Sequence, residues 1–159
     1  MMLKTRSRAR RSGTTIVETA IVSLVCLTFM FAIFEYGRYV MVRQVMENAA
    51  RVGARMSVVM PTSYVSAAVA TQQVNDAITH ALASIPLSGT PTVTMFQADN
   101  SGNNIGPWTQ TPFGRNIVVQ IDGDLPVMFP TFGFIPNNST TVPNAIHITV
   151  KVMMRGEAN

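Results

Sequence analysis

A nearly uninterrupted apolar segment close to the N-terminus constrains this chain more than any other feature. Residues 19–34 contain no charged side chain, and Ile16 and Val17 extend the apolar run beyond Glu18. A helix from Ile16 to Phe34 would be about 28 Å long at 1.5 Å per residue, which matches the ~30 Å hydrocarbon layer of a bilayer. The segment therefore predicts a single transmembrane helix over residues 16–36.

The charge of the chain is concentrated ahead of this segment. The 159-residue sequence has a formal net charge of +4, and five cationic residues precede Thr14: Lys4, Arg6, Arg8, Arg10 and Arg11. The remainder holds seven Lys/Arg and eight Asp/Glu, so no basic patch is left for nucleic acid. A basic run beside an apolar helix is typical of the cytoplasmic flank of a membrane anchor. A cleavable secretory signal would end at a small-residue site, and here the run ends in Phe34 and Glu35.

A carboxylate lies inside the apolar segment. Glu18 falls one turn after Gly13, Thr14 and Thr15, which are residue types found where helices begin. An acidic side chain in a membrane helix is costly and usually faces a partner or a polar cavity. The alternative is that Glu18 lies at the interface, where it is hydrated and interacts favourably with the helix dipole. Glu18 is therefore a candidate assembly residue.

Several motifs of the N-terminal third resemble a known family. Glu18 is the fifth residue after Gly13, the Glu35-Tyr36-Gly37-Arg38 step follows the apolar helix, and Asn48-Ala49-Ala50-Arg51 precedes Gly53-Ala54-Arg55. Together, over residues 10–56, they resemble the TadE-like family, the pseudopilins of the Tad (Flp) type IVb pilus.

The resemblance implies a processed pilus protein. A prepilin peptidase would cleave after Gly13, remove the basic leader of residues 1–13 and leave Thr14 as the new N-terminus, whose amine Glu18 of a neighbouring subunit could neutralise. In the major Flp pilin the glutamate is followed by tyrosine. Here Thr19 follows Glu18 and the chain is much longer, which favours a minor subunit.

The helical pattern continues beyond the membrane segment. No breaker occurs before Pro61, and one set of apolar residues is spaced 3, 4, 3, 4, 3: Val42, Val45, Ala49, Val52, Met56 and Val59. The sequence thus predicts a long helix over Thr15–Met60, within a segment 14–60. This spacing is typical of a coiled coil, and also of a helix packed on its own domain, which is favoured because fewer than three heptads repeat.

The remainder, residues 61–159, predicts a small α+β domain outside the membrane. Apolar residues from Val65 to Ile85 fall mostly on one face of a second, amphipathic helix. Alternating, β-rich composition then predicts strands at 92–97, 116–122 and 145–154, separated by turns at 98–106 and a Pro-punctuated loop at 124–143. The fold class is therefore α+β, with a small antiparallel sheet.

The long loop is unusually apolar for a connection. Phe129, Phe132 and Phe134 either fill the core or form a contact patch for a partner.

No catalytic or metal-binding constellation is predicted, and no cofactor is expected. His80 and His147 lie on a predicted helix and strand without a nearby carboxylate or thiol spacing, and Asp122-Gly123-Asp124 is explained by a strand-ending turn. Cys26, the single cysteine, lies inside the anchor and excludes an intrachain disulfide.

Two hypotheses follow, and an enzyme is not expected. The first is a single-pass protein of the bacterial inner membrane, with a cytoplasmic N-terminus and a periplasmic domain. It acts as a minor pilin or pseudopilin with other pilin-like subunits, Tad assembly proteins and the peptidase as partners, and it could enter the pilus. The second is an anchored periplasmic or surface module that binds a ligand through the 124–143 loop and never enters a filament.

Overall fold

The computed structural model describes residues 12–59, 66–112, 114–128, 139 and 142–156. The elements follow in the order α1 (Ser12–Val59), α2 (Ala67–Leu82), β1 (Ser88–Ala98), β2 (Asn104–Pro107), a short 3-10 helix η1 (Trp108–Gln110), β3 (Asn116–Pro126) and β4 (Ala145–Arg155). The strands form one antiparallel sheet in the order β2-β1-β3-β4. The predicted α+β class, with a long N-terminal helix, a second helix and a small antiparallel sheet, is confirmed.

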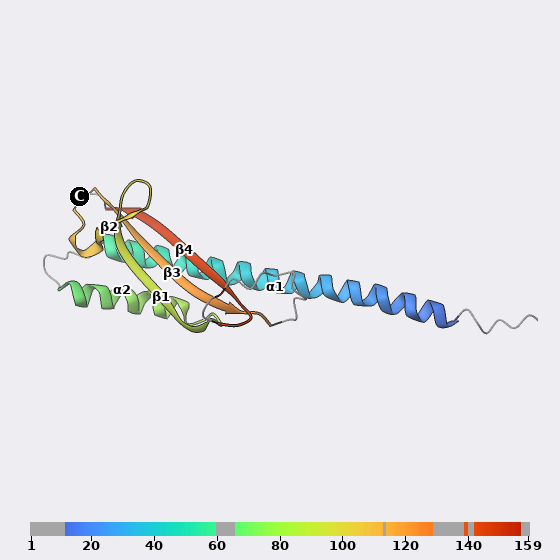
Figure 1. The fold of residues 1–159 in the computed structure, drawn as a ribbon. Helices are drawn as coiled ribbons and strands as arrows, with labels where there is room; N and C mark the ends of the chain where they lie inside the picture. The colour runs from blue at the N-terminus through green and yellow to red at the C-terminus, as the bar shows by residue number, and fades with distance from the viewer. Residues whose placement is uncertain (1–11, 60–65, 113, 129–138, 140–141, 157–159) are drawn as a thin grey trace, which may run out of the picture.

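α1 is one continuous helix that belongs to two environments. Its 48 residues contain no proline, and at 1.5 Å per residue they extend about 72 Å. The N-terminal half projects beyond the rest of the molecule, whereas the C-terminal half lies against the sheet and α2 (Figure 1).

α2 folds back along the C-terminal half of α1. Its N-terminus is capped by Ser66, whose hydroxyl accepts a hydrogen bond from the Val69 N–H at 3.4 Å. The buried face of α2 repeats every four residues, at Ala70, Val74, Ile78 and Leu82. This spacing gives one apolar face, as the sequence predicts for an amphipathic helix.

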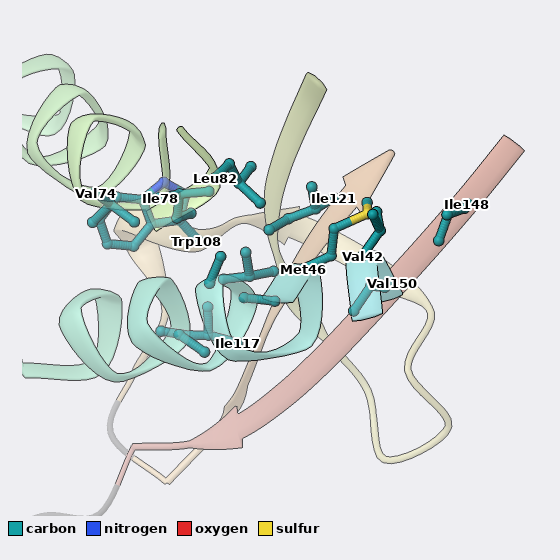
Figure 2. Close-up of a cluster of buried hydrophobic side chains, with 14 of the residues drawn as sticks. Val42, Met46, Val74, Ile78, Leu82, Trp108, Ile117, Ile121, Ile148 and Val150 are labelled. Atoms are coloured by element: carbon teal, nitrogen blue, oxygen red, sulfur yellow. The ribbon is translucent and has the colours of Figure 1, made fainter. Parts of the chain in front are cut away.

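The core lies between the two helices and the inner face of the sheet. Alternate residues of β3 point into it because successive strand side chains face opposite sides, so Ile117, Val119, Ile121 and Leu125 are buried there. From α1, Val42 and Met46 meet them, and Figure 2 shows these side chains converging with those of α2.

The helix uses a different buried face from the expected one. Val42 and Ala49 of the predicted set are buried, but Val52 and Val59 are 46% and 72% exposed. In their place, small residues fill the contact: Ala50, Gly53, Ala54 and Ser57. The prediction followed the large apolar residues, whereas the close approach of α2 selects small ones.

Gly53 marks the point of closest approach. A Cβ added at this glycine would lie 2.5 Å from Ile78 Cδ1 and 2.8 Å from Ile78 Cγ1, well inside van der Waals contact. The helix is therefore packed on its own domain there, which was the favoured alternative for this segment.

The sheet also departs from the prediction in two places. Residues 98–106 were expected to be only a turn, but β2 begins inside this range at Asn104 and runs to Pro107. Asp99 accepts hydrogen bonds from the Ser101 and Asn103 N–H groups, and the chain then pairs with β1. β3 continues through Asp122, Gly123 and Asp124 to Pro126, so these residues are not a strand-ending turn. β3 is paired on both sides, with β1 and with β4, and this pairing outweighs the low strand propensity of Gly and Asp.

Candidate functional site

The projecting half of α1 is an apolar surface that the domain does not cover. From Gly13 to Phe34 every side chain is exposed except those of Thr28 and Phe31, which are partly covered. α1 is long and apolar enough to cross a membrane over part of Gly13–Val59, and none of its most apolar window is buried inside the molecule. Membrane anchoring by this helix agrees with the prediction.

Threonines in this half satisfy their hydroxyl groups locally. Thr19 Oγ1 donates to the Thr15 carbonyl at 2.8 Å, and Thr28 Oγ1 donates to the Leu24 carbonyl at 2.9 Å. Such bonds to the carbonyl four residues earlier leave no free donor to desolvate, so these residues are compatible with lipid.

The predicted processing and assembly residues lie at the tip of this helix. Gly13 and Thr14 are exposed in its first turn, and an added Cβ at Gly13 would meet nothing within 4 Å. Glu18 is exposed one turn further and makes no hydrogen bond or ion pair with any other described residue. The structure therefore presents a carboxylate on an apolar helix surface, with no intramolecular partner among the described residues to offset its cost in lipid.

A buried ion pair marks the point where α1 enters the domain. Glu35, the first residue after the apolar run, is only 2% exposed. Arg38 Nη2 donates to Glu35 Oε1 at 2.9 Å and also to the backbone carbonyl of Pro126 at the end of β3. Glu35 Oε2 and Arg38 Nε are buried without a partner among the described residues. Because a half-broken buried pair is costly, this contact fixes α1 to the end of β3.

The Glu35-Tyr36-Gly37-Arg38 motif does not by itself predict that the Glu35–Arg38 ion pair is buried. Glu35 and Arg38 are spaced i,i+3 and could equally have formed a hydrated surface pair. The two cases are distinguished by a contact distant in sequence, that of Arg38 with the Pro126 carbonyl at the end of β3.

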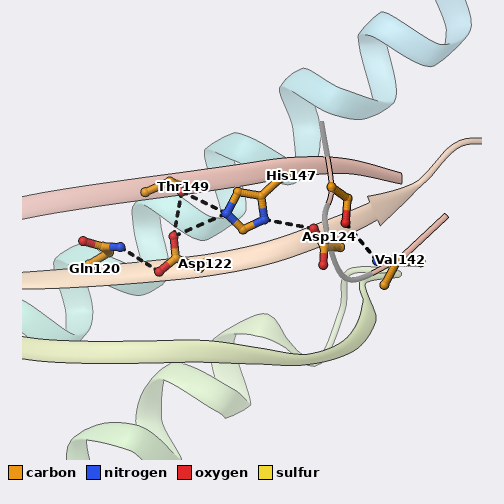
Figure 3. A network of polar contacts seen from close by, with 7 residues as sticks. Gln120, Asp122, Asp124, Val142, His147 and Thr149 are labelled. Atoms are coloured by element: carbon orange, nitrogen blue, oxygen red, sulfur yellow. Dashed lines mark hydrogen bonds and ion pairs between the residues drawn. The ribbon is translucent and has the colours of Figure 1, made fainter. Parts of the chain in front are cut away.

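A polar network lies on the outer face of the sheet, away from α1 (Figure 3). His147 Nδ1 is 2.9 Å from Asp124 Oδ1, and His147 Nε2 is 3.8 Å from Asp122 Oδ1. Thr149 Oγ1 donates to Asp122 Oδ1 at 2.6 Å, and Gln120 Nε2 donates to Asp122 Oδ2 at 2.7 Å.

The expectation that His147 has no carboxylate nearby is therefore wrong. The antiparallel register pairs Asp124 with His147 and Asp122 with Thr149, which places all four side chains on one face. Sequence spacing misses this because the residues come from different strands. Among the described residues, no three His, Cys, Asp or Glu side chains are grouped so as to hold a metal ion.

The other singled-out residues lie apart from both features. His80 is exposed in the last turn of α2, and Cys26 is exposed on the projecting half of α1. Phe129, Phe132 and Phe134, the proposed partner contact, lie outside the described residues.

Comparison with known proteins identifies the N-terminal helix. Residues 13–55 match the family model described as TadE-like protein, which confirms the family suggested by the sequence motifs. The matched range lies entirely within α1. Neither the curated proteins nor the solved structures contain a match to this chain. The family match indicates a pilin-like protein associated with the Tad pilus.

Proposed function

We propose, from the TadE-like match of α1, that this chain is a minor pilin or pseudopilin in the assembly of a Tad (Flp) type IVb pilus. It acts through contacts between helices and between domains, and catalyses no reaction. The observation that carries the proposal is Glu18, an exposed carboxylate on an apolar, membrane-length helix surface within the matched range.

The proposed topology follows the charge distribution. The five cationic residues before Thr14 hold the N-terminus in the cytoplasm, and the domain that follows α1 lies in the periplasm. α1 is thus anchored in the inner membrane, from which the subunit passes to the pilus machinery.

Processing would convert the anchored precursor into a subunit that can assemble. Cleavage after Gly13 by a prepilin peptidase removes the basic leader and creates a positive amine on Thr14. An unpaired carboxylate in lipid is costly, and a neighbouring subunit's amine offsets that cost. Glu18 then draws subunits together through their apolar helices, and assembly depends on cleavage.

The exposed tip of α1 supports this order of events. Gly13 lies on the described end of a projecting helix with open space around its Cα, so a peptidase can approach the bond after it. The buried Glu35–Arg38 pair lies at the far end of the apolar segment, so removal of the leader leaves the domain intact.

The experiment is intact-mass analysis of the full chain produced with a prepilin peptidase. The unsubstituted chain should lose the mass of residues 1–13. Gly13→Leu should keep the full mass, whereas Gly37→Leu, at a second open glycine of the same helix, should be cleaved normally. A full-length unsubstituted product would overturn the processing step.

A further inference from the structure

β3 lies alongside the domain half of α1 and runs in the opposite direction. A Cβ added to Gly123 in the middle of its second half would be 3.5 Å from Met46 Cε. Three residues later, the Pro126 carbonyl accepts a hydrogen bond from Arg38, which lies eight residues earlier on the helix. β3 therefore advances towards the projecting half of α1 and ends beside the turn where that half begins (Figure 1).

The end of β3 lies at the level where α1 leaves its apolar segment. Arg38, which holds the Pro126 carbonyl, is four residues after Phe34, the last residue of the apolar run. Four residues of helix correspond to about 6 Å, and the headgroup layer on each side of a bilayer is about 5–8 Å thick. When α1 crosses a membrane up to Phe34, the end of β3 therefore lies in the headgroup layer.

Two tyrosines of α1 mark the same level. Tyr36 is 68% exposed, and its ring stacks on that of Tyr39 with the ring centroids 6.4 Å apart. Tyrosine is enriched at membrane–water interfaces because its ring is apolar and its hydroxyl group can be hydrated. These residues therefore place the interface at the turn of α1 that contacts Pro126, independently of the length of the apolar run.

The chain beyond Pro126 presents apolar side chains close to this level. Val127 is partly exposed, and Met128 is 67% exposed. Two residues of extended chain span at most about 7 Å, so the Met128 backbone stays within that distance of Pro126. The sequence contains no Asp, Glu, Lys or Arg between Asp124 and Lys151. We call Pro126, Val127 and Met128 the β3 end.

The charged groups nearest the β3 end are bound within the chain. Glu35 is 2% exposed and is paired with Arg38 at 2.9 Å. Asp124 is 8% exposed, and its Oδ1 atom lies 2.9 Å from Nδ1 of His147. Desolvation of exposed charges is the main cost of moving a protein surface into contact with lipid. Because Glu35 and Asp124 are already buried and bonded, lipid contact at the β3 end adds little to their desolvation.

We infer that the β3 end lies against the surface of the membrane that α1 crosses, with the Met128 side chain among the upper parts of the acyl chains. The contact requires only that α1 spans the membrane, and not that the chain enters a pilus. Its ligand is the boundary between headgroups and acyl chains, because the β3 end is apolar and uncharged. The domain is then attached to the membrane at two points, α1 and β3, and the second restrains its tilt.

The test is quenching by lipid of a fluorophore on the full chain, inserted in phosphatidylcholine vesicles. In a Cys26→Ser background, Met128→Cys carries the label at the β3 end. Ser101→Cys is the matched control, because Ser101 is exposed in the turn after β1, at the opposite end of the sheet. A nitroxide near the top of the acyl chains serves as the quencher.

The two labels should differ because the ends of the sheet lie at different heights along α1. The end opposite Pro126 lies near Val58, whose Cγ1 atom is 3.9 Å from a Cβ added to Gly156. From Arg38 to Val58 the helix rises about 30 Å. The Met128→Cys label should therefore be quenched at least about fivefold more than the Ser101→Cys label. Equal quenching of the two labels would overturn the inference.

A second measurement excludes insertion that is driven by the fluorophore. In the same vesicles, the unlabelled Met128→Cys thiol should react with a water-soluble maleimide at least about fivefold more slowly than the Ser101→Cys thiol. Slow reaction of the Met128→Cys thiol without quenching of its label would mean that protein rather than lipid covers the β3 end. That result would also overturn the inference.

The composition of the vesicles distinguishes acyl-chain contact from headgroup binding. Replacing part of the phosphatidylcholine with phosphatidylglycerol should leave the quenching unchanged, because the β3 end carries no charge. Quenching that occurs only with phosphatidylglycerol would contradict an apolar contact. The vesicles contain no other pilus protein, so failure of the lipid contact would leave the proposed function standing.

Discussion

The two halves of α1 share one helix but differ in what surrounds them. Between Gly13 and Phe34 the side chains are almost all apolar or hydroxyl-bearing, and all but those of Thr28 and Phe31 are exposed. Glu18 makes no hydrogen bond or ion pair with another described residue. From Glu35 to Val59 the helix has a buried face, in which Met46 and Val42 lie among small residues, packed on α2, β3 and β4. The first half is long and apolar enough to cross a membrane and is not covered by the domain, whereas the second half packs within the chain.

The Glu35–Arg38 pair lies at the boundary between the projecting half of α1 and the half that packs on the domain. Up to Phe34 a substitution changes what the helix meets outside the molecule, and from Glu35 onward a substitution on the buried face changes the fold. The comparison therefore predicts that assembly and stability can be altered independently by changes in the same helix, at Glu18 and at Arg38 respectively.

The largest expected effect comes from breaking the buried Glu35–Arg38 ion pair. Arg38→Met leaves the Glu35 carboxylate buried and unpaired, which should lower the free energy of unfolding by about 3 kcal/mol. Arg43→Met removes an exposed ion pair with Glu47 and should cost less than about 1 kcal/mol. Denaturant unfolding of the purified chain measures both.

The double variant Glu35→Leu/Arg38→Met sharpens this test. Because both charges are removed and apolar groups fill the space, most of the lost stability should return. If Arg38→Met and Arg43→Met lowered the free energy of unfolding equally, the result would contradict the burial of the Glu35–Arg38 pair.

A smaller effect is expected where the two helices touch. Gly53→Val places two methyl groups where even a Cβ would lie 2.5 Å from Ile78 Cδ1, and should lower the free energy of unfolding by about 1–3 kcal/mol. Gly37→Ala, on the open face of the same helix, should be neutral or stabilise by about 0.5–1 kcal/mol through helix propensity. Matching unfolding curves for the two variants would contradict the packing described for α2.

The smallest effect concerns a turn far from α1. The backbone N–H and then the side-chain amide of Asn103 hold the pKa of Asp99 below its ordinary value, with further help from the Ser101 and Gly102 N–H groups. Because this folded-state pKa is lowered, the stabilisation is present above the unfolded-state pKa and fades as the pH falls through the folded one. Asp99→Ala should therefore cause a slight loss of stability at pH 7 that disappears in acid. A loss of the same size at low pH would contradict the carboxylate's role.

Much of the architecture could be predicted from local patterns. The apolar run, the unbroken helical spacing up to Pro61 and the alternation in β3 and β4 each report on one element, because periodicity reflects which face that element buries. The TadE-like resemblance likewise rested on motifs confined to α1.

The remaining features depend on which segments meet in space. The proximity of His147 to Asp124 follows from strand register, and the burial of Glu35 follows from the path of β3. Val52 and Val59 looked like core residues because they are large and regularly spaced. The buried face of α1 instead contains Gly53, because Ile78 of α2 lies too close to this position to leave room for a side chain.

The most direct measurement of the central claim is piliation by cells that carry Glu18→Ala in the full chain, scored beside the stability of the purified variant. Glu18 is exposed and makes no hydrogen bond or ion pair with another described residue, so we predict an unchanged unfolding temperature and normal membrane insertion, together with a loss of pili. Normal piliation by Glu18→Ala would contradict the account and favour an anchored binding module that never enters a filament.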